Sequence, residues 1–189
     1  MTQGDVLQAM VAKLDASEIP YMLSGSVASS AYGKPRSTED LDIIISPTLP
    51  QLNALLVALP PDEYYASFEA AKAAFFEQSM FNVIDLATGW KVDLIFLKSK
   101  GFEKEKFARR VKHSVLGRQI LMVTPEDSIL SKLEWRKESR SERQYVDAVN
   151  VAARIENLDL NYLHRWAKEL GISEDLEQLL RDADELRPR

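Results

Sequence analysis

The stretch LSGSVASSAYGKPRSTEDLDIII, from Leu23 to Ile45, decides the fold. It opens with the end of a short apolar run that breaks at Gly25, and it closes with Asp40 and Asp42 in what otherwise has the pattern of a buried β-strand. Aspartate is depleted in strands because it packs poorly there and competes for backbone hydrogen bonds. Two aspartates separated by a single residue on such a strand therefore require a chemical explanation.

A cation site is the explanation that the strand geometry favours. Side chains alternate along a strand, so Asp40 and Asp42 share one face while Leu41 and Ile43 point the other way, toward the core. Two neighbouring carboxylates repel each other unless a cation lies between them. Mg²⁺ prefers carboxylate oxygens and retains positions for water and substrate phosphates. The alternative is that each aspartate is an ordinary residue at a strand end facing water.

A third carboxylate occurs in the segment WKVDLIF, residues 90–96, where Asp93 lies between apolar residues of a second predicted strand. If this strand lies beside the first, Asp93 completes a cluster of three carboxylates. Such a cluster is the usual basis of a two-metal site, in which one ion activates an attacking hydroxyl and the other holds a triphosphate. Asp85 in VIDLAT is the nearest competitor for this role.

The Gly25-Ser26 pair predicts a tight turn into a short helix. Glycine lets the backbone turn sharply and approach a ligand closely. Ser26 would present its hydroxyl and backbone N–H groups at a helix N-terminus, where phosphate binds well. The alternative is a simple helix cap, and many caps have the same two residues.

Composition limits the classes of function. The chain has 189 residues, 46% of them hydrophobic and 28% charged, as expected for a globular protein with a real core. A net charge of −5 argues against nucleic-acid binding by a wholly basic surface. With no cysteine, disulfides, thiol catalysis and Cys-ligated zinc are excluded. The N-terminus lacks a signal-peptide pattern, and no apolar run approaches the ~20 residues of a membrane span, so a cytoplasmic protein without membrane contact is expected.

Periodicity predicts an α/β (α+β) chain in two parts. Residues 1–124 form a mixed core domain, with helices expected over 5–16, 26–32, 48–59, 67–78 and 102–110, and strands over 20–25, 40–46, 118–124 and twice within 80–98. At TPED the character changes, because a capping Thr124, Pro125 and two acids signal a helix start. Residues 125–189 form a C-terminal helical domain, with helices expected over 126–138, 141–155, 159–170 and 173–184.

The combination of Gly25-Ser26, a spacer of thirteen residues, and Asp40-Leu41-Asp42 resembles the signature of the DNA polymerase β-like nucleotidyltransferase superfamily. In that signature a third carboxylate follows on a later strand, as Asp93 would. The pattern Arg36-x-Thr38-x-Asp40-x-Asp42 looks like that of the AbiEii-type toxin branch, and it is also similar to that of lincosamide nucleotidyltransferases.

The C-terminal part adds to the resemblance. TPEDSILSKLEW followed by SERQYVDAV is similar to the helical half of AbiEii-type proteins, in which a lysine precedes an Arg-x-x-x-Asp on the next helix. The matching positions are Lys132, Arg143 and Asp147. Read without the family, Arg143 and Asp147 are spaced as an ordinary ion pair within one helix. The resemblance covers roughly residues 20–150 and implies a small mixed β-sheet nucleotidyltransferase core with flanking helices plus a C-terminal helical bundle.

The resemblance implies a role for each matching residue. The catalytic and metal-binding residues would be Asp40, Asp42 and Asp93; the nucleotide-binding residues would be Gly25, Ser26, Arg36, Thr38, Lys132, Arg143 and Asp147. The cofactor would be Mg²⁺, with two ions in the active complex, and the substrate an NTP such as ATP. The reaction would move an NMP to an acceptor hydroxyl and release pyrophosphate.

The acceptor stays open at this point. In the toxin branch it is tRNA, another RNA or a protein side chain, and the partner is an antitoxin protein. In the antibiotic-modifying branch it is a small molecule with a free hydroxyl. A third reading is a non-catalytic module that keeps the fold and binds a nucleotide or a protein.

Overall fold

A computed structural model describes residues 2–38, 40–115 and 117–187 of the chain. Its contacts divide into two compact units, which interleave in the sequence. The first unit comprises Met1–Gly25 and Thr38–Met122, and the second comprises Ser26–Ser37 and Val123–Arg189. A single boundary after residue 124 is the prediction from the sequence; the contacts of the structure change unit after Gly25, after Ser37 and after Met122.

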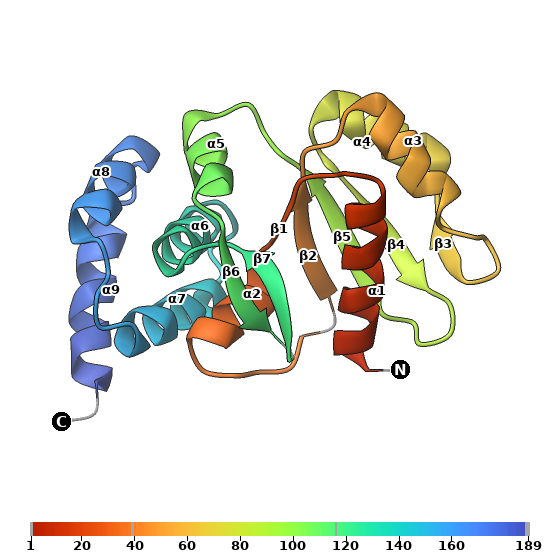
Figure 1. Ribbon diagram of the computed structural model, residues 1–189. Coiled ribbons are helices and arrows are strands. Elements are labelled where there is room, and N and C mark those ends of the chain that lie inside the picture. The colour runs from red at the N-terminus through yellow and green to blue at the C-terminus, as the bar shows by residue number, and fades with distance from the viewer. Residues whose placement is uncertain (1, 39, 116, 188–189) are drawn as a thin grey trace. The chain divides into compact units, whose positions relative to one another are not determined.

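The first unit is built on a mixed sheet with the strand order β3-β4-β5-β2-β1-β7-β6 (Figure 1). Its strands are β1 (Tyr21–Leu23), β2 (Asp40–Ile45), β3 (Tyr64–Ala66), β4 (Met80–Asp85), β5 (Lys91–Phe96), β6 (Val111–Val115) and β7 (Arg118–Met122). At its centre β2 pairs parallel with β5 and antiparallel with β1. This mixture of directions agrees with the predicted mixed sheet.

The apolar halves of the central strands form the core of the first unit. Leu41 and Ile43 of β2 and Leu94 of β5 are completely buried, as is Met22 of β1. A strand covered on both faces is expected to be a nearly continuous apolar run, and the III end of β2 has this pattern. The polar start of β2 is therefore the exception to the buried pattern of this strand.

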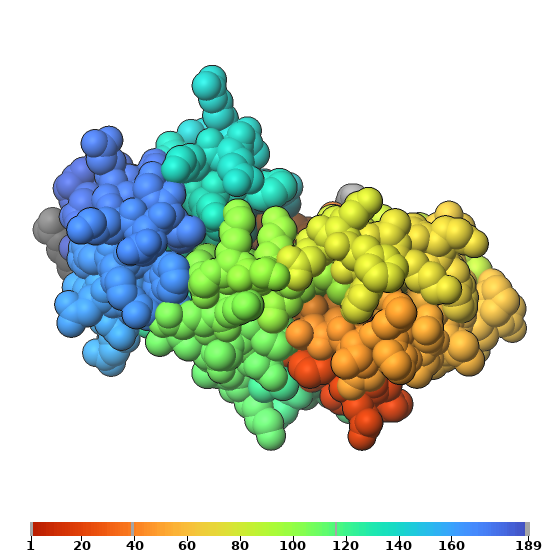
Figure 2. Space-filling model, turned by 90° about the horizontal axis from the view of Figure 1, so that it is seen from above, coloured from red at the N-terminus to blue at the C-terminus, as the bar shows by residue number. Residues whose placement is uncertain are grey.

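Four helices of the first unit flank the sheet: α1 (Gln3–Ala16), α3 (Leu49–Val57), α4 (Phe68–Glu77) and α5 (Gly101–Ala108). Helix α1 crosses the face of the sheet turned toward the viewer in Figure 1 and buries Leu7 and Leu14. Helices α3 and α4 lie side by side, as Figure 2 also shows from above. Side-chain oxygens of Thr2, Thr48 and Ser67 cap α1, α3 and α4, satisfying backbone N–H groups that a helix start leaves unpaired.

The second unit is helical. It contains all of α2 (Gly25–Tyr32) except its first residue, together with α6 (Pro125–Ser139), α7 (Glu142–Arg154), α8 (Leu160–Leu170) and α9 (Ser173–Leu186). Leu133, Val151, Leu163 and Leu176 are completely buried in it, one from each of the last four helices. Thr124 caps α6, as the TPED pattern predicts.

Residues 26–37 are packed closely into this helical unit. A Cβ on Gly33 would lie 3.0 Å from the backbone nitrogen of Val151, so glycine lets the end of α2 approach the backbone of α7. The hydroxyl of Tyr32 donates a hydrogen bond to the carbonyl of Val123 at 2.9 Å. Burial, together with the charges of Glu126 and Asp127, raises the pKa of Tyr32 to about 12.

The helices and strands that periodicity predicts are present, with ends shifted by a few residues. Two edge strands, β3 and β6, were not expected. Strand β3 has only three residues, and β6 carries the polar residues Lys112, His113 and Ser114. Each forms by pairing antiparallel with a predicted strand, β3 with β4 and β6 with β7. Within the parts of the chain that the structure describes, no helix has the length and apolar character of a membrane span.

Candidate functional site

The register of β2 against β5 brings two of the predicted carboxylates together. Asp42 lies directly opposite Asp93, and Asp40 lies directly opposite Lys91. Opposite residues on paired strands point to the same face, and alternation puts Asp40 and Asp42 on that face together. All three predicted catalytic residues therefore project from one side of the sheet. Asp93 is buried, whereas the side chain of Asp40 is about half exposed.

Gly25 is the residue that lets the chain pass beside Asp42. The backbone N–H of Ser24 donates to the carbonyl of Asp42 at 2.9 Å, and the next residue, Gly25, has φ +63°. A Cβ added to Gly25 would lie 1.9 Å from Oδ2 of Asp42. Both the left-handed backbone and the lack of space thus require glycine, and the tight turn predicted at this position adjoins the carboxylates.

Lys91 bridges two of the three aspartates. Its Nζ lies 3.0 Å from Oδ1 of Asp40 and 3.3 Å from Oδ2 of Asp93. The hydrogen bond with Asp40 raises the pKa of Lys91, and the nearby Asp93 adds to this effect, although partial burial acts in the opposite direction. An ammonium group therefore supplies positive charge to the face where the sequence predicts a cation.

Two further contacts position the carboxylate cluster. The side-chain amide of Asn82, opposite Asp93 on β4, donates a hydrogen bond to Oδ1 of Asp93. The hydroxyl of Thr38 lies 3.4 Å from the carbonyl of Asp40, and the carbonyl of Thr38 accepts a hydrogen bond from Gln3 of α1. Thr38, predicted to bind nucleotide, therefore lies two residues before β2 and in the same unit as the aspartates.

The donor set suits a hard divalent cation, because three carboxylates share a face and a cationic group already contacts two of them. In the described residues, however, no group of three or more His, Asp or Glu side chains is arranged to hold a metal ion. In this arrangement Lys91 contacts one carboxylate oxygen of Asp40 and one of Asp93.

A second polar cluster lies within the helical unit, around Asp147 of α7. Its carboxylate accepts hydrogen bonds from Nε and Nη2 of Arg36, at 2.9 and 2.7 Å, and from Nζ of Lys132 at 2.9 Å. Burial alone would raise the pKa of Asp147, but the hydrogen bonds and charges of Arg36 and Lys132 outweigh it and lower the pKa. Lys132, itself buried, also donates to Gln144 at 3.0 Å.

Arg36 links this cluster to the start of α2, because its Nη2 also donates to Oγ of Ser26 at 2.6 Å. Four predicted nucleotide-binding residues thus form one network in the second unit: Ser26, Arg36, Lys132 and Asp147. Arg143, the fifth predicted residue of this unit, is exposed on α7. The carboxylate of Asp147 is bound by Arg36, 111 positions away in the sequence, and by Lys132 of α6. Its contacts are therefore not those of a simple ion pair with Arg143 within one helix.

Comparison with known proteins shows which solved structures share this fold. No protein-family model matches the chain. No curated protein matches it either. Among solved structures, it is similar to an antigenic nucleotidyltransferase-like protein from Paracoccidioides brasiliensis, with a TM-score of 0.56 and 16% identity over 94% of this chain and 91% of that one. The fold is a nucleotidyltransferase fold.

Two antibiotic-modifying enzymes share the nucleotidyltransferase fold with this chain. The lincosamide antibiotic adenylyltransferase LnuA, solved with lincomycin bound, matches with a TM-score of 0.57 and 12% identity, over 82% of this chain and 99% of that one. ANT(2'')-Ia, solved in complex with adenylyl-2''-tobramycin, matches with a TM-score of 0.53 and 14% identity, over 98% of each chain. The predicted fold class is thereby confirmed.

Sequence reasoning missed the contacts that Lys91 and Asn82 make with the predicted carboxylates. Lys91 lies two residues before Asp93, so strand alternation alone places the two side chains on one face. Asn82 is likewise a polar residue inside the predicted strand MFNVID. Both polar residues are visible in the sequence, but whether they contact the carboxylates depends on which strands pair and in which register.

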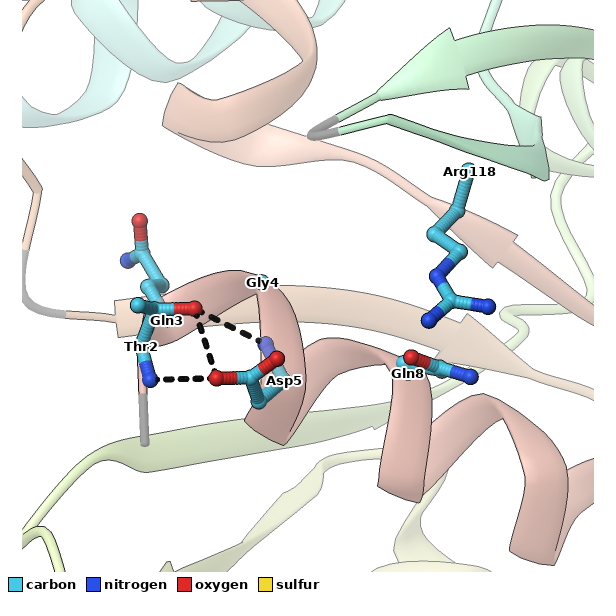
Figure 3. Close-up of a pocket in the computed structure, with 6 residues that line it drawn as sticks. All are labelled: Thr2, Gln3, Gly4, Asp5, Gln8 and Arg118. Carbon is cyan, nitrogen blue, oxygen red and sulfur yellow. Dashed lines mark hydrogen bonds between the residues drawn. The ribbon is translucent and has the colours of Figure 1, made fainter.

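A surface pocket of the first unit lies elsewhere, beside the start of α1 (Figure 3). Thr2 and Asp5 exchange the hydrogen bonds of a capping box there, and Arg118 extends toward Gln8. Among the described residues that line this pocket, none is a predicted catalytic or nucleotide-binding residue. The carboxylates of β2 and β5 therefore remain the candidate centre of the nucleotidyltransferase fold.

Proposed function

We propose that the protein is a Mg²⁺-dependent nucleotidyltransferase that moves an NMP from an NTP to an acceptor hydroxyl. One observation carries the proposal: Asp42 and Asp93 stand opposite each other on parallel strands, with Asp40 on the same face and Gly25 directly against Asp42. Burying one carboxylate and grouping two more beside it costs stability, and a catalytic use is a reason for the fold to retain such a group. The nucleotidyltransferase fold supports that use.

The proposed reaction forms a bond from the acceptor oxygen to the α-phosphorus and breaks the bond from that phosphorus to the β-phosphate bridging oxygen. Pyrophosphate leaves with the electron pair of the broken bond. Asp93 receives the proton of the acceptor hydroxyl, and the contact from Asn82 orients its carboxylate. Asp40, Asp42 and Asp93 would hold Mg²⁺, which neutralises the charge that develops on the phosphates when bound.

We assign nucleotide binding to Gly25, Ser26, Arg36, Thr38, Lys132, Arg143 and Asp147, on the resemblance in sequence. The network of the second unit supports the assignment for Lys132 and Arg36, because it gathers two cationic groups at one carboxylate. A triphosphate is the kind of anion that such a cluster attracts. Asp147 would act as a positioning residue, since its oxygens face the two cations.

A small-molecule hydroxyl is the acceptor that the structural comparisons favour, since the lincomycin-bound and tobramycin-derived complexes belong to proteins of this fold. The net charge of −5 also speaks against a large RNA acceptor. The toxin reading, with tRNA or a protein side chain as acceptor and an antitoxin as partner, rests on the AbiEii-like sequence pattern. Expression with and without the neighbouring gene separates the two: growth arrest supports the toxin, and drug resistance with normal growth supports the antibiotic-modifying enzyme.

The direct test is incubation with each NTP labelled at the α-phosphate, with Mg²⁺, and with either a lysate or a set of antibiotics. We expect label in an acceptor with wild type, none after chelation by EDTA, and a loss of at least about 10²-fold in Asp42→Asn, the size expected when charge stabilisation at a transition state is removed. Asp62→Asn, an exposed aspartate of the same unit, is the matched control.

The non-catalytic alternative gives a different result in the same material. Calorimetric titration of Mg²⁺-NTP would then show binding in wild type and loss of binding in Asp40→Ala, with no labelled acceptor under any condition. Equal labelling by wild type and Asp42→Asn would refute the proposed chemistry.

A further inference from the structure

Lys91 is the residue of the candidate site that neither the sequence motif nor the proposed chemistry uses. It lies on β5, two residues before Asp93 and opposite Asp40 on β2. Its ammonium contacts both of these aspartates, at 3.0 and 3.3 Å. A divalent cation bound by both aspartates would compete with this ammonium for their carboxylate oxygens.

We propose that Lys91 is an internal counter-ion of the carboxylate cluster, which a divalent metal ion must displace in order to bind. This inference rests on the proposed function, because that function requires the metal. Lys91 thereby lowers the affinity of the nucleotide-free protein for metal, and it holds Asp40 beside Asp93 while no metal is bound.

Charge is the first reason. Three carboxylates on one face repel one another, and a single ammonium between two of them removes much of that repulsion. The contacts of Lys91 span the two strands, so they also bring Asp40 of β2 toward Asp93 of β5. Without this cation, Asp40 and Asp93 would lose the ammonium that bridges them and would repel each other more strongly.

Geometry is the second reason. Mg²⁺ requires a nearly octahedral shell of oxygens at about 2.0–2.1 Å. An ammonium group that donates hydrogen bonds to one oxygen of Asp40 and one of Asp93 occupies the approach to both. The metal and the ammonium therefore exclude each other at these two oxygens.

Freedom to leave is the third reason. The side chain of Lys91 is 37% exposed, and a lysine has a flexible four-carbon stem. Rotation about this stem carries the ammonium into water without any movement of the backbone. Asp93, by contrast, is nine-tenths buried at its side chain and is held by Asn82, so it stays in place for the metal.

The test measures metal binding alone, without nucleotide. Mn²⁺ is titrated into the full chain, and free Mn²⁺ is followed by electron paramagnetic resonance. We expect Lys91→Met to bind Mn²⁺ about tenfold more tightly than wild type, the effect of about one neighbouring charge on an ionic equilibrium. Lys91→Arg, which keeps the positive charge, should bind like wild type. Lys112→Met, an exposed lysine of β6, is the matched control.

A thermal scan in EDTA and in Mg²⁺ provides a second readout. Lys91→Met should unfold at a lower temperature than wild type in EDTA and should gain more from added Mg²⁺, because binding to the folded state stabilises it. A lysine that serves only as a surface ion pair would lower the unfolding temperature without changing the gain from Mg²⁺.

Mn²⁺ binding by Lys91→Met that is no tighter than in wild type, or too weak to detect in both, overturns the proposal. So does a gain in affinity that persists in the double variant Lys91→Met, Asp93→Asn. These outcomes are separate from the proposed function, which is judged by transfer of labelled NMP. Tighter Mn²⁺ binding with no transfer to any acceptor would refute the activity and retain the role of Lys91.

Discussion

Gly25 and Asp42 lie so close together that a methyl group on the glycine would be 1.9 Å from a carboxylate oxygen of the aspartate. The two residues are seventeen positions apart in the chain, and the hydrogen bond from Ser24 to the carbonyl of Asp42 holds the strands at this spacing. The orientation of Asp42 thus depends on Gly25 having no Cβ.

Gly25→Ala should therefore displace the carboxylate of Asp42. We expect a loss of stability of about 1–3 kcal/mol from the left-handed backbone and the clash, measured by urea unfolding, together with a loss of NMP transfer. Gly89→Ala is the matched control, because Gly89 has φ +75° but nothing within 4 Å of an added Cβ. It should show the backbone cost and keep the transfer activity; equal losses of activity in both variants would contradict the steric explanation.

Asn82→Ala should weaken catalysis through Asp93. Its amide donates to the buried carboxylate, so its removal leaves Asp93 less well oriented. Partners of this kind typically contribute 10–100-fold to activity or metal affinity, and we expect a fall of about that size in kcat with little change in KM for the NTP. Asn53→Ala, an exposed asparagine of α3, serves as control. A rise in KM with unchanged kcat would show that Asn82 acts on substrate binding instead.

Asp147→Asn should destabilise the helical unit. The carboxylate and Lys132 are both buried, and loss of one partner leaves an uncompensated buried charge. Arg36 is partly exposed, so its share is screened by water, and we expect a total loss of about 2–4 kcal/mol. Asp184→Asn, which removes the exposed pair with Arg187, should cost less than about 0.5 kcal/mol. Unfolding in urea measures both, and similar values for the two variants would contradict the structural role of Asp147.

The same carboxylate should make stability depend on pH in the acid range. The pKa of Asp147 is lowered in the folded protein from its ordinary value of 3.8, so the folded state binds its proton less readily than the unfolded state does. Its contribution is therefore complete above about pH 5 and is lost as pH falls below 3.8 toward the folded pKa. The stability difference between wild type and Asp147→Asn should shrink from pH 6 to pH 3. A constant difference over that range would show that charge is not its source.

The carboxylate face was predictable because it depends on short-range rules. Alternation places Asp40 and Asp42 together whatever the strand pairs with, and the Gly25-Ser26 turn has a local backbone signature. Caps such as Thr124 also depend only on neighbours in the sequence. These features are encoded within a few residues, so one sequence suffices to find them.

The roles of Lys91 and Asp147 depend on long-range register instead. Lys91 meets Asp40 only because β2 and β5 pair in parallel with one particular register. Asp147 has a possible partner, Arg143, at helical spacing, yet it binds Arg36, which is 111 positions away in the sequence. Local spacing cannot distinguish an ion pair within one helix from an ion pair with a distant residue that the tertiary fold brings close. Strands β3 and β6 were missed for the same reason, because each is stabilised by pairing with a neighbouring strand, β4 or β7.

The interleaving of the two units has a consequence for biosynthesis. Residues 26–37 leave the ribosome about a hundred residues before α7, the helix against which Gly33 packs and to which Arg36 is tied. In the nascent chain this segment therefore lacks its packing and ion-pair partners on α7 until nearly the whole polypeptide is made. A fragment that ends at residue 122 would expose it permanently, so we expect such a truncation to aggregate or be degraded, and the two units to mature together after synthesis is complete.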